Sequence, residues 1–203
     1  YSTTKSEEYD GSSWTATPTL NTARAAGTGT GTSTASIVFG AYPPSNAPAT
    51  ESWNGSSWTT TPATVGAPME RAGGSGTQTA ALAMGGIVVS PPAQSSAVEQ
   101  WDGSSWTTKS SLTTARGYGG ASGTYTSAIF FGGNPSSATG ATEGWDGTSW
   151  STRPSLGTAR GGLGSSGTSA DLGLAYGGGS YLASTEEFTG ETTAVNIETF
   201  STS

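Results

Sequence analysis

The sequence has no cysteine and no histidine, and only seven of its 203 residues are lysine or arginine. The absence of cysteine excludes disulfide bridges and thiolate metal sites. The absence of histidine removes the most common general base and the most common ligand of zinc, copper and non-haem iron. We therefore expect no metal site and no cofactor, and we assign a catalytic role to no residue.

Positive charge and long apolar runs are also scarce. With a net charge of −7, the chain lacks the clusters of lysine and arginine that bind a phosphate backbone, so we expect no nucleic-acid partner. No apolar run approaches the ~18 residues that a membrane-spanning helix needs. Residues 1–20 show no signal-peptide pattern. We therefore expect no membrane insertion.

The composition excludes a helical bundle. Hydrophobic residues make up only 32% of the chain, which contains 32 glycines, and the usual helix formers are rare. Such a composition is typical of disordered segments, but seven tryptophans are more than such segments usually carry. An all-β fold is the class that remains.

An internal repeat dominates the sequence. A block of the type Glu-x-aromatic-Asp-Gly-Ser-Ser-Trp starts at Glu7, Glu51, Glu99 and Glu143, with a degenerate copy at Glu186. Two more landmarks keep the same order, an arginine and an apolar segment that ends in glycine (IVFGA, LAMGG, IFFGG and LAYGG). The arginines are Arg24, Arg71, Arg116 and Arg160. This order predicts repeated structural units of about 45 residues each.

Each repeat predicts four short antiparallel strands. The Asp-Gly or Asn-Gly pair between two aromatic residues is a hairpin signal, and the glycine-rich segment after arginine precedes an apolar strand. Repeats of this length and strand number are typical of a β-propeller. We expect one propeller domain over residues 1–203, with four four-stranded blades. A five-bladed ring would need an inner strand pair that this chain lacks.

The repeat resembles the kelch repeat. The resemblance rests on the order of an apolar strand ending in Gly-Gly, a loop, Glu-x-aromatic-Asp, a turn, Trp-Thr and Thr-Ala-Arg, and it covers nearly the whole chain. The two aromatic residues stand closer together than in the usual kelch pattern, and Gly40-Ala41 replaces the first double glycine. This short form is similar to kelch-like repeats of phage tail fibres and of other viral or bacterial surface proteins. The resemblance implies an extracellular or virion-surface location.

We expect the repeated residues to be structural. The tryptophan row should pack between neighbouring blades, together with the aromatic row at Tyr9, Trp53, Trp101, Trp145 and Phe188; an exposed shelf for sugars is the alternative. The tryptophan row consists of Trp14, Trp58, Trp106 and Trp150. We expect the four arginines to bind repeat glutamates or loop carbonyls. The alternative is a carboxylate-binding cluster as in sialidases, whose Asp-box the block resembles with a spacing one residue shorter.

The variable loops are the candidate ligand site, because recognition residues concentrate on loops. The loops after the glycine pairs span 41–50, 87–97, 134–141 and 179–184, and they share a face with the segments that lead into arginine. They carry apolar groups that are not repeated, beside prolines that limit the entropy lost on binding. The predicted ligand-binding residues are Tyr42, Val88, Val89, Tyr181 and Leu182.

These features predict a non-enzymatic recognition or adhesion module that binds a host-surface glycan or protein. Other fibre subunits are a further candidate partner. One alternative is a hydrolase or lyase that acts on a polysaccharide through paired carboxylates, which require neither histidine nor cysteine. The acidic residues outside the repeat form no evident pair. A purely structural spacer in a fibre is the other alternative.

Overall fold

The structure of the protein is a computed structural model that describes residues 2–42, 49–64, 69–89, 91–134, 136–179, 181–190 and 197–200. Every regular element in these ranges is a β-strand, and no helix occurs among them. The strands form antiparallel sheets of two to four strands. The predicted all-β class is therefore confirmed.

Four sheets have four strands each, and within each sheet the strands lie in chain order. The first two sheets contain β3 (Thr28–Thr32), β4 (Ala35–Phe39), β5 (Ala49–Trp53) and β6 (Trp58–Thr64), then β8 (Gly73–Thr77), β9 (Ala80–Met84), β12 (Val98–Trp101) and β13 (Trp106–Lys109). The last two contain β14 (Gly120–Gly123), β15 (Ala128–Phe131), β16 (Thr142–Trp145) and β17 (Trp150–Arg153), then β18 (Gly164–Ser169), β19 (Leu172–Tyr176), β20 (Thr185–Phe188) and β21 (Ile197–Phe200). The four antiparallel strands expected for each repeat are thus present.

Two smaller sheets complete the described structure. A hairpin of β1 (Ser6–Tyr9) and β2 (Trp14–Thr17) precedes the first complete sheet. Part of the loop predicted at 87–97 instead forms a hairpin of β10 (Ile87–Val89) and β11 (Pro92–Gln94), which pairs with β7 (Met69–Glu70). This post-glycine segment is therefore paired with the segment that leads into β8, the first strand of the same sheet.

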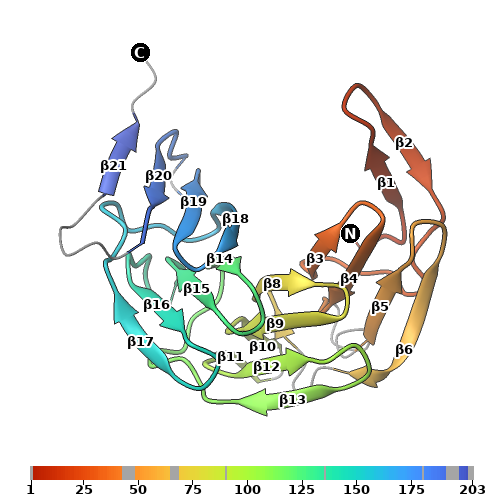
Figure 1. Ribbon diagram of the computed structural model, residues 1–203, viewed down its shortest axis with the longest axis horizontal. Coiled ribbons are helices and arrows are strands. Elements are labelled where there is room, and N and C mark those ends of the chain that lie inside the picture. Colours follow the sequence, from red (N-terminus) through yellow and green to blue (C-terminus); the bar gives the residue numbers. More distant parts are fainter. Residues whose placement is uncertain are drawn as a thin grey trace.

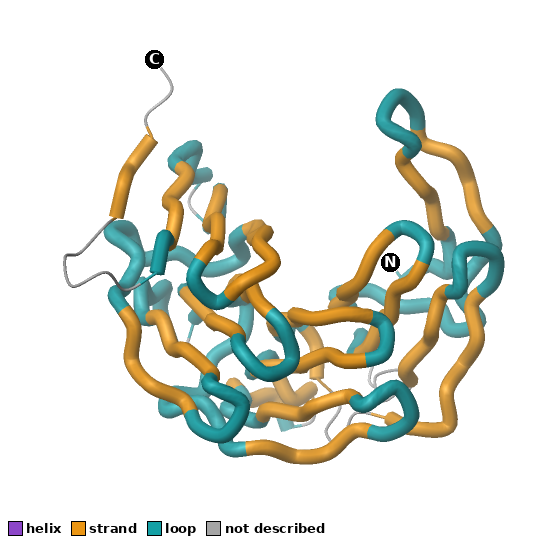
Figure 2. Tube along the Cα trace, viewed as in Figure 1, coloured by secondary structure: helices purple, strands orange, loops and turns teal. Residues whose placement is uncertain are grey.

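The sheets stand side by side along an open arc, with the β1–β2 hairpin at one end and the β18–β21 sheet at the other (Figures 1 and 2). The first strands of successive sheets, β3, β8, β14 and β18, contact one another along the inside of the arc. Hydroxyl groups join them: Thr28 and Thr30 donate to carbonyls of Ala72 and Gly76 at 2.9 and 2.7 Å. Threonine hydroxyl groups thus connect the first strands of the first two complete sheets by hydrogen bonds.

Apolar side chains fill the spaces between neighbouring sheets. The aromatic residue of the third strand is almost completely buried in three sheets, with Trp53, Trp101 and Trp145 at most 5% exposed. Each lies against the apolar strand next to it or in the preceding sheet, as Trp101 does with Ile37 and Phe39. Trp101 and Trp145 thus supply the inter-sheet packing that was expected of this row, whereas Tyr9 is 50% exposed and does not.

The predicted burial of the tryptophan row is wrong for Trp14 and only partly met elsewhere. Trp14 is 68% exposed, whereas Trp58, Trp106 and Trp150 are half-buried. These residues begin the outermost strand of each sheet, where a side chain has fewer neighbours than on the third strand. Trp106 still reaches the preceding sheet, with its ring 5.0 Å from that of Phe39 and its Nε1 donating to Thr50 at 3.0 Å.

The Asp-Gly hairpins form as predicted. In the turn after Trp101, Asp102 accepts bonds from the backbone N–H groups of Ser104 and Ser105, both at 2.8 Å, while Gly103 has a φ of 95°. The backbone of Ser105 and then the hydroxyl of Ser104 hold the pKa of Asp102 well below its ordinary value of 3.8. Asp10 and Asp146 make the same backbone bonds, so these aspartates stabilise the turns.

Candidate functional site

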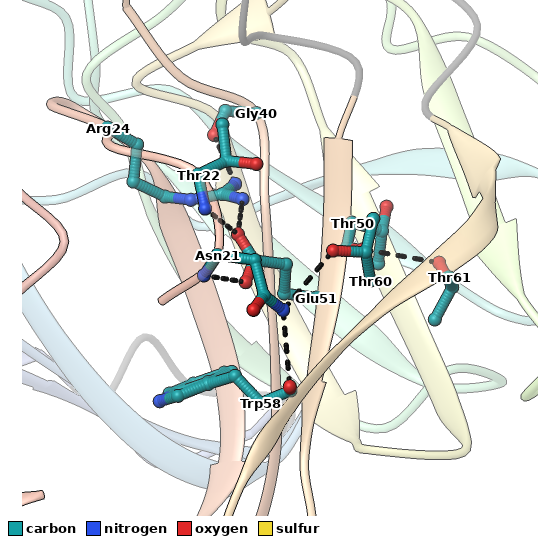
Figure 3. A network of polar contacts seen from close by, with 9 residues as sticks. All are labelled: Asn21, Thr22, Arg24, Gly40, Thr50, Glu51, Trp58, Thr60 and Thr61. Atoms are coloured by element: carbon teal, nitrogen blue, oxygen red, sulfur yellow. Dashed lines mark hydrogen bonds and ion pairs between the residues drawn. The ribbon is translucent and has the colours of Figure 1, made fainter. Parts of the chain in front are cut away.

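Three of the four predicted arginines are buried in ion pairs with repeat glutamates. Arg24 pairs with Glu51 at 2.5 Å, Arg116 with Glu143 at 2.6 Å and Arg160 with Glu186 at 2.5 Å. Figure 3 shows the first of these networks, in which Glu51 also accepts bonds from the backbone of Asn21 and Thr22. The three pairs lie in separate sheets, so these arginines form no carboxylate-binding cluster.

Arg71 does not share this arrangement, because its ion-pair partner is Glu70, at 3.6 Å, and not a repeat glutamate. The backbone carbonyls of Arg116 and Arg160 accept hydrogen bonds from the N–H groups of Gly86 and Gly133. In the second repeat the equivalent carbonyl is that of Met69, which accepts a bond from the N–H of Ala41. Met69 is buried at 1% exposed and packs with Ile37 and Phe39. Arg71 lies two residues later, with its side chain 43% exposed.

Arg71 belongs to an open row of four residues with left-handed backbone that follows the curve of the arc and is called the left-handed ring below. Ala26, Arg71, Tyr118 and Gly162 occupy equivalent positions in the four repeats and have φ values of 53°, 56°, 62° and 67°. The N–H of Arg71 donates to the carbonyl of Ala26, that of Tyr118 to Arg71 and that of Gly162 to Tyr118, at 3.0, 3.0 and 2.8 Å. This ring links all four complete sheets on the face that carries the post-glycine loops.

Two members of the ring carry large side chains where glycine is the residue without strain. Left-handed backbone costs a residue with a Cβ about 1–2 kcal/mol, and such strain is concentrated at functional sites. The guanidinium carbon of Arg71 lies 4.7 Å from the centre of the Tyr118 ring, and Arg71 Nε lies 3.6 Å from the carboxylate of Glu70. At an exposed site a stack of this kind contributes about 0.5–1 kcal/mol, less than the strain of the two residues.

The predicted ligand-binding residues surround this ring unevenly. Tyr42 is 52% exposed and its backbone pairs with Ala25, next to the ring. Val88 is half-buried opposite Met69, and the side chain of Val89 lies outside the described residues. Tyr181 is fully exposed with a φ of 59°, and Leu182 is half-buried. Tyr42 and Tyr181 are therefore the accessible members of the predicted set.

A groove of about 920 Å³ runs along the inner strands. Gly27, Ala72, Gly119 and Leu163, each the residue that follows a ring member, lie at the end of the groove next to the ring. Threonine, serine and glycine dominate the described lining, which includes no charged side chain. The groove offers hydroxyl and backbone groups to a polar ligand, and its lining includes Ala72 and Gly119, the chain neighbours of Arg71 and Tyr118.

Glu51, Glu143 and Glu186 are committed to ion pairs, and no group of three or more potential metal ligands occurs among the described residues. No helix in the described ranges is long and apolar enough to cross a membrane.

The sequence contained a signal that separates Arg71 from the other arginines. Arg24, Arg116 and Arg160 each stand ten residues after the tryptophan of their repeat, whereas Arg71 stands thirteen residues after Trp58. Tyr118 stands out in the sequence as a large residue in a segment where the other repeats have small ones, but the sequence did not indicate that its partner is the arginine of the neighbouring sheet. Only the folded chain brings the two side chains together.

The sequence matches no protein-family model, and a search of curated proteins finds no significant match.

Proposed function

We propose that this chain is a kelch-like β-propeller that serves as a non-enzymatic recognition module, located outside the cell or on a virion. Support for the propeller comes from the four sheets of four antiparallel strands, with their first strands in contact along the inside of the arc. In this interpretation each complete sheet is a blade, and the β1–β2 hairpin is the outer half of a further blade.

The ligand site is the face with the left-handed ring and the post-glycine loops. The observation that carries this assignment is the stack of Arg71 on Tyr118, two large side chains at ring positions where glycine would be unstrained. Tyr42 and Tyr181 add exposed aromatic surface around the ring. Recognition of one partner requires such a distinctive surface, whereas the four Asp-Gly hairpins on the opposite ends of the strands are nearly identical.

A host-surface glycan is the ligand that this face fits best. Tyrosine rings present flat apolar faces to sugar rings, and the adjoining groove supplies hydroxyl and backbone hydrogen-bonding groups. Arg71 is the one cation of the ring, and Glu70 beside it keeps the local charge near neutral. We therefore expect a predominantly uncharged glycan, bound with weak dependence on salt concentration.

The test uses substitutions by glycine at the ring, because glycine removes a side chain and is compatible with the left-handed backbone. The Arg71→Gly and Tyr118→Gly proteins are applied to a glycan array beside the wild type. Ala26→Gly is the matched control, since it changes an equivalent ring position that has no large side chain. We expect Arg71→Gly and Tyr118→Gly to lose most binding without a fall in melting temperature, and Ala26→Gly to bind as the wild type does.

Other outcomes identify the alternatives. Binding that survives in both ring variants would place the ligand elsewhere and contradict the assignment. Release of reducing ends in the same samples would indicate the hydrolase or lyase. Binding to cells but to no glycan, lost in the same two variants, would keep the site and replace the glycan by a host protein.

A further inference from the structure

Each of the first three complete sheets has an apolar row on its second strand that the following sheet covers. The row consists of Ile37 and Phe39 on β4, Leu82 and Met84 on β9, and Ile129 and Phe131 on β15. All six side chains are at most 3% exposed. The second strand of the last sheet, β19, carries the same row as Leu174 and Tyr176, but these are 38% and 44% exposed, beside Leu172 at 54%.

Aromatic residues of the next sheet provide the cover in all three internal interfaces. Trp101 and Trp106 pack with Ile37 and Phe39. Trp145 and Trp150 belong to the cluster of Leu82 and Met84, and Phe188 packs with Ile129 and Phe131. The interface therefore has two constant halves, an apolar row on one sheet and aromatic residues from the hairpin of the next.

The β1–β2 hairpin carries the aromatic half of this interface. Tyr9 and Trp14 face each other across the hairpin in the register of Trp101 and Trp106. Their ring centres are 5.3 Å apart at 38° between planes, against 5.4 Å and 43° in the buried pair. Tyr9 is 50% exposed and Trp14 is 68% exposed. This aromatic half is thus formed, and among the residues that the structure describes no apolar row lies against it.

We propose that this protein associates head to tail, with the β1–β2 hairpin of one copy packed on the exposed row of β19 in a second copy. The two complementary halves lie at opposite ends of the arc in one molecule (Figure 1), so a second copy can supply each missing half. The contact would continue an interface that the chain already uses three times. Because the two surfaces differ, the association is heterologous and produces a chain of copies or a closed ring.

The wild-type protein tests this by sedimentation velocity over a range of concentrations, where we expect mass to increase beyond the monomer. Leu174→Glu blocks the apolar row and Trp14→Glu blocks the aromatic half, so each variant alone should stay monomeric. A mixture of the two retains one working pair of surfaces and should form a dimer and nothing larger. Tyr125→Glu is the matched control, an exposed tyrosine in the turn between β14 and β15 that belongs neither to the hairpin nor to the β19 row, and it should associate as the wild type does.

Single cysteines provide a second measurement that does not depend on the glutamate variants folding. The chain has no cysteine, so Trp14→Cys and Leu174→Cys each introduce one thiol. Under mild oxidation we expect a disulfide-linked dimer from the mixture, in excess over either variant alone.

Three results would overturn the proposal. These are a monomeric wild type at all concentrations, self-association of Trp14→Glu alone, and equal cross-linking in the mixture and in the separate cysteine variants. A monomer that cross-links within one molecule when it carries both cysteines would show that the hairpin closes onto its own last sheet.

Discussion

Removal of the Arg116 side chain should destabilise the protein strongly, because it leaves a buried carboxylate without its cation. Arg116 is 0% exposed, donates to Glu143 at 2.6 Å and to the carbonyl of Phe130 at 3.3 Å, and lies over the Phe130 ring. In Arg116→Ala, Glu143 keeps only its two bonds from Thr113, both at 2.7 Å. We expect a loss of about 3–5 kcal/mol, the usual cost of removing one partner of a buried ion pair.

The measurement is the free energy of unfolding from urea titration, supported by thermal melting. For a chain of this size a loss of 3–5 kcal/mol corresponds to a fall in melting temperature of roughly 6–20 °C. Replacing both members of the pair by apolar residues should recover much of the loss, because the uncompensated charge is then gone.

Arg71→Ala is the matched control, since the repeat pattern alone would give Arg71 the same role as Arg116. Its side chain is 43% exposed and lies on Tyr118, so we expect a loss of at most about 1 kcal/mol. Equal losses in Arg71→Ala and Arg116→Ala would refute the assignment of Met69 to the arginine position. An unchanged stability in Arg116→Ala would refute the role given to the buried ion pairs.

Three further predictions concern the turns, the tryptophans and the inner glycines. Asp102→Ala should lower the melting temperature at neutral pH, whereas Asp102→Asn should keep the turn. Because folding depresses the pKa of Asp102, the stability that its carboxylate contributes is present above pH 3.8 and is lost as the pH falls below this value. Melting temperatures of the asparagine variant should therefore depend less on pH in acid than those of the wild type. Trp106→Ala should cost about 2–3 kcal/mol in urea titration, since the ring is half-buried, while Trp14→Ala should change stability by no more than about 0.5 kcal/mol. Gly119→Ala should cost about 1–3 kcal/mol, because its Cβ would lie 2.5 Å from the buried ring of Phe130; an unchanged unfolding midpoint would mean that the ring moves away freely.

The sequence by itself determined the strands, the turns and the repeat. Asp-Gly between two aromatic residues forms a hairpin because the carboxylate accepts the turn N–H groups and glycine permits positive φ, and both effects act within a few residues. The apolar runs IVF, LAM and IFF likewise indicated which strand of each repeat enters the core. The ion pairs were also predictable, since the arginine and glutamate of each pair stand 26 or 27 residues apart in three repeats.

Tertiary structure decided everything that depends on the neighbour of a given residue. Trp101 and Trp106 occur in the same repeated block, yet the first is buried and the second half-buried. Trp101 is on the third strand of its sheet, between two neighbours, and Trp106 is on the edge strand. Leu174 has the sequence pattern of a core residue but is exposed, since no sheet follows it in the described structure.

The candidate site shows the same division. Met69 takes the arginine position because the backbone, and not the residue type, keeps the repeat register. Arg71 and Tyr118 come from different repeats, and only the packing of adjacent sheets places one side chain over the other. A linear pattern records what each repeat contains, whereas contacts between repeats depend on how the sheets are arranged in space.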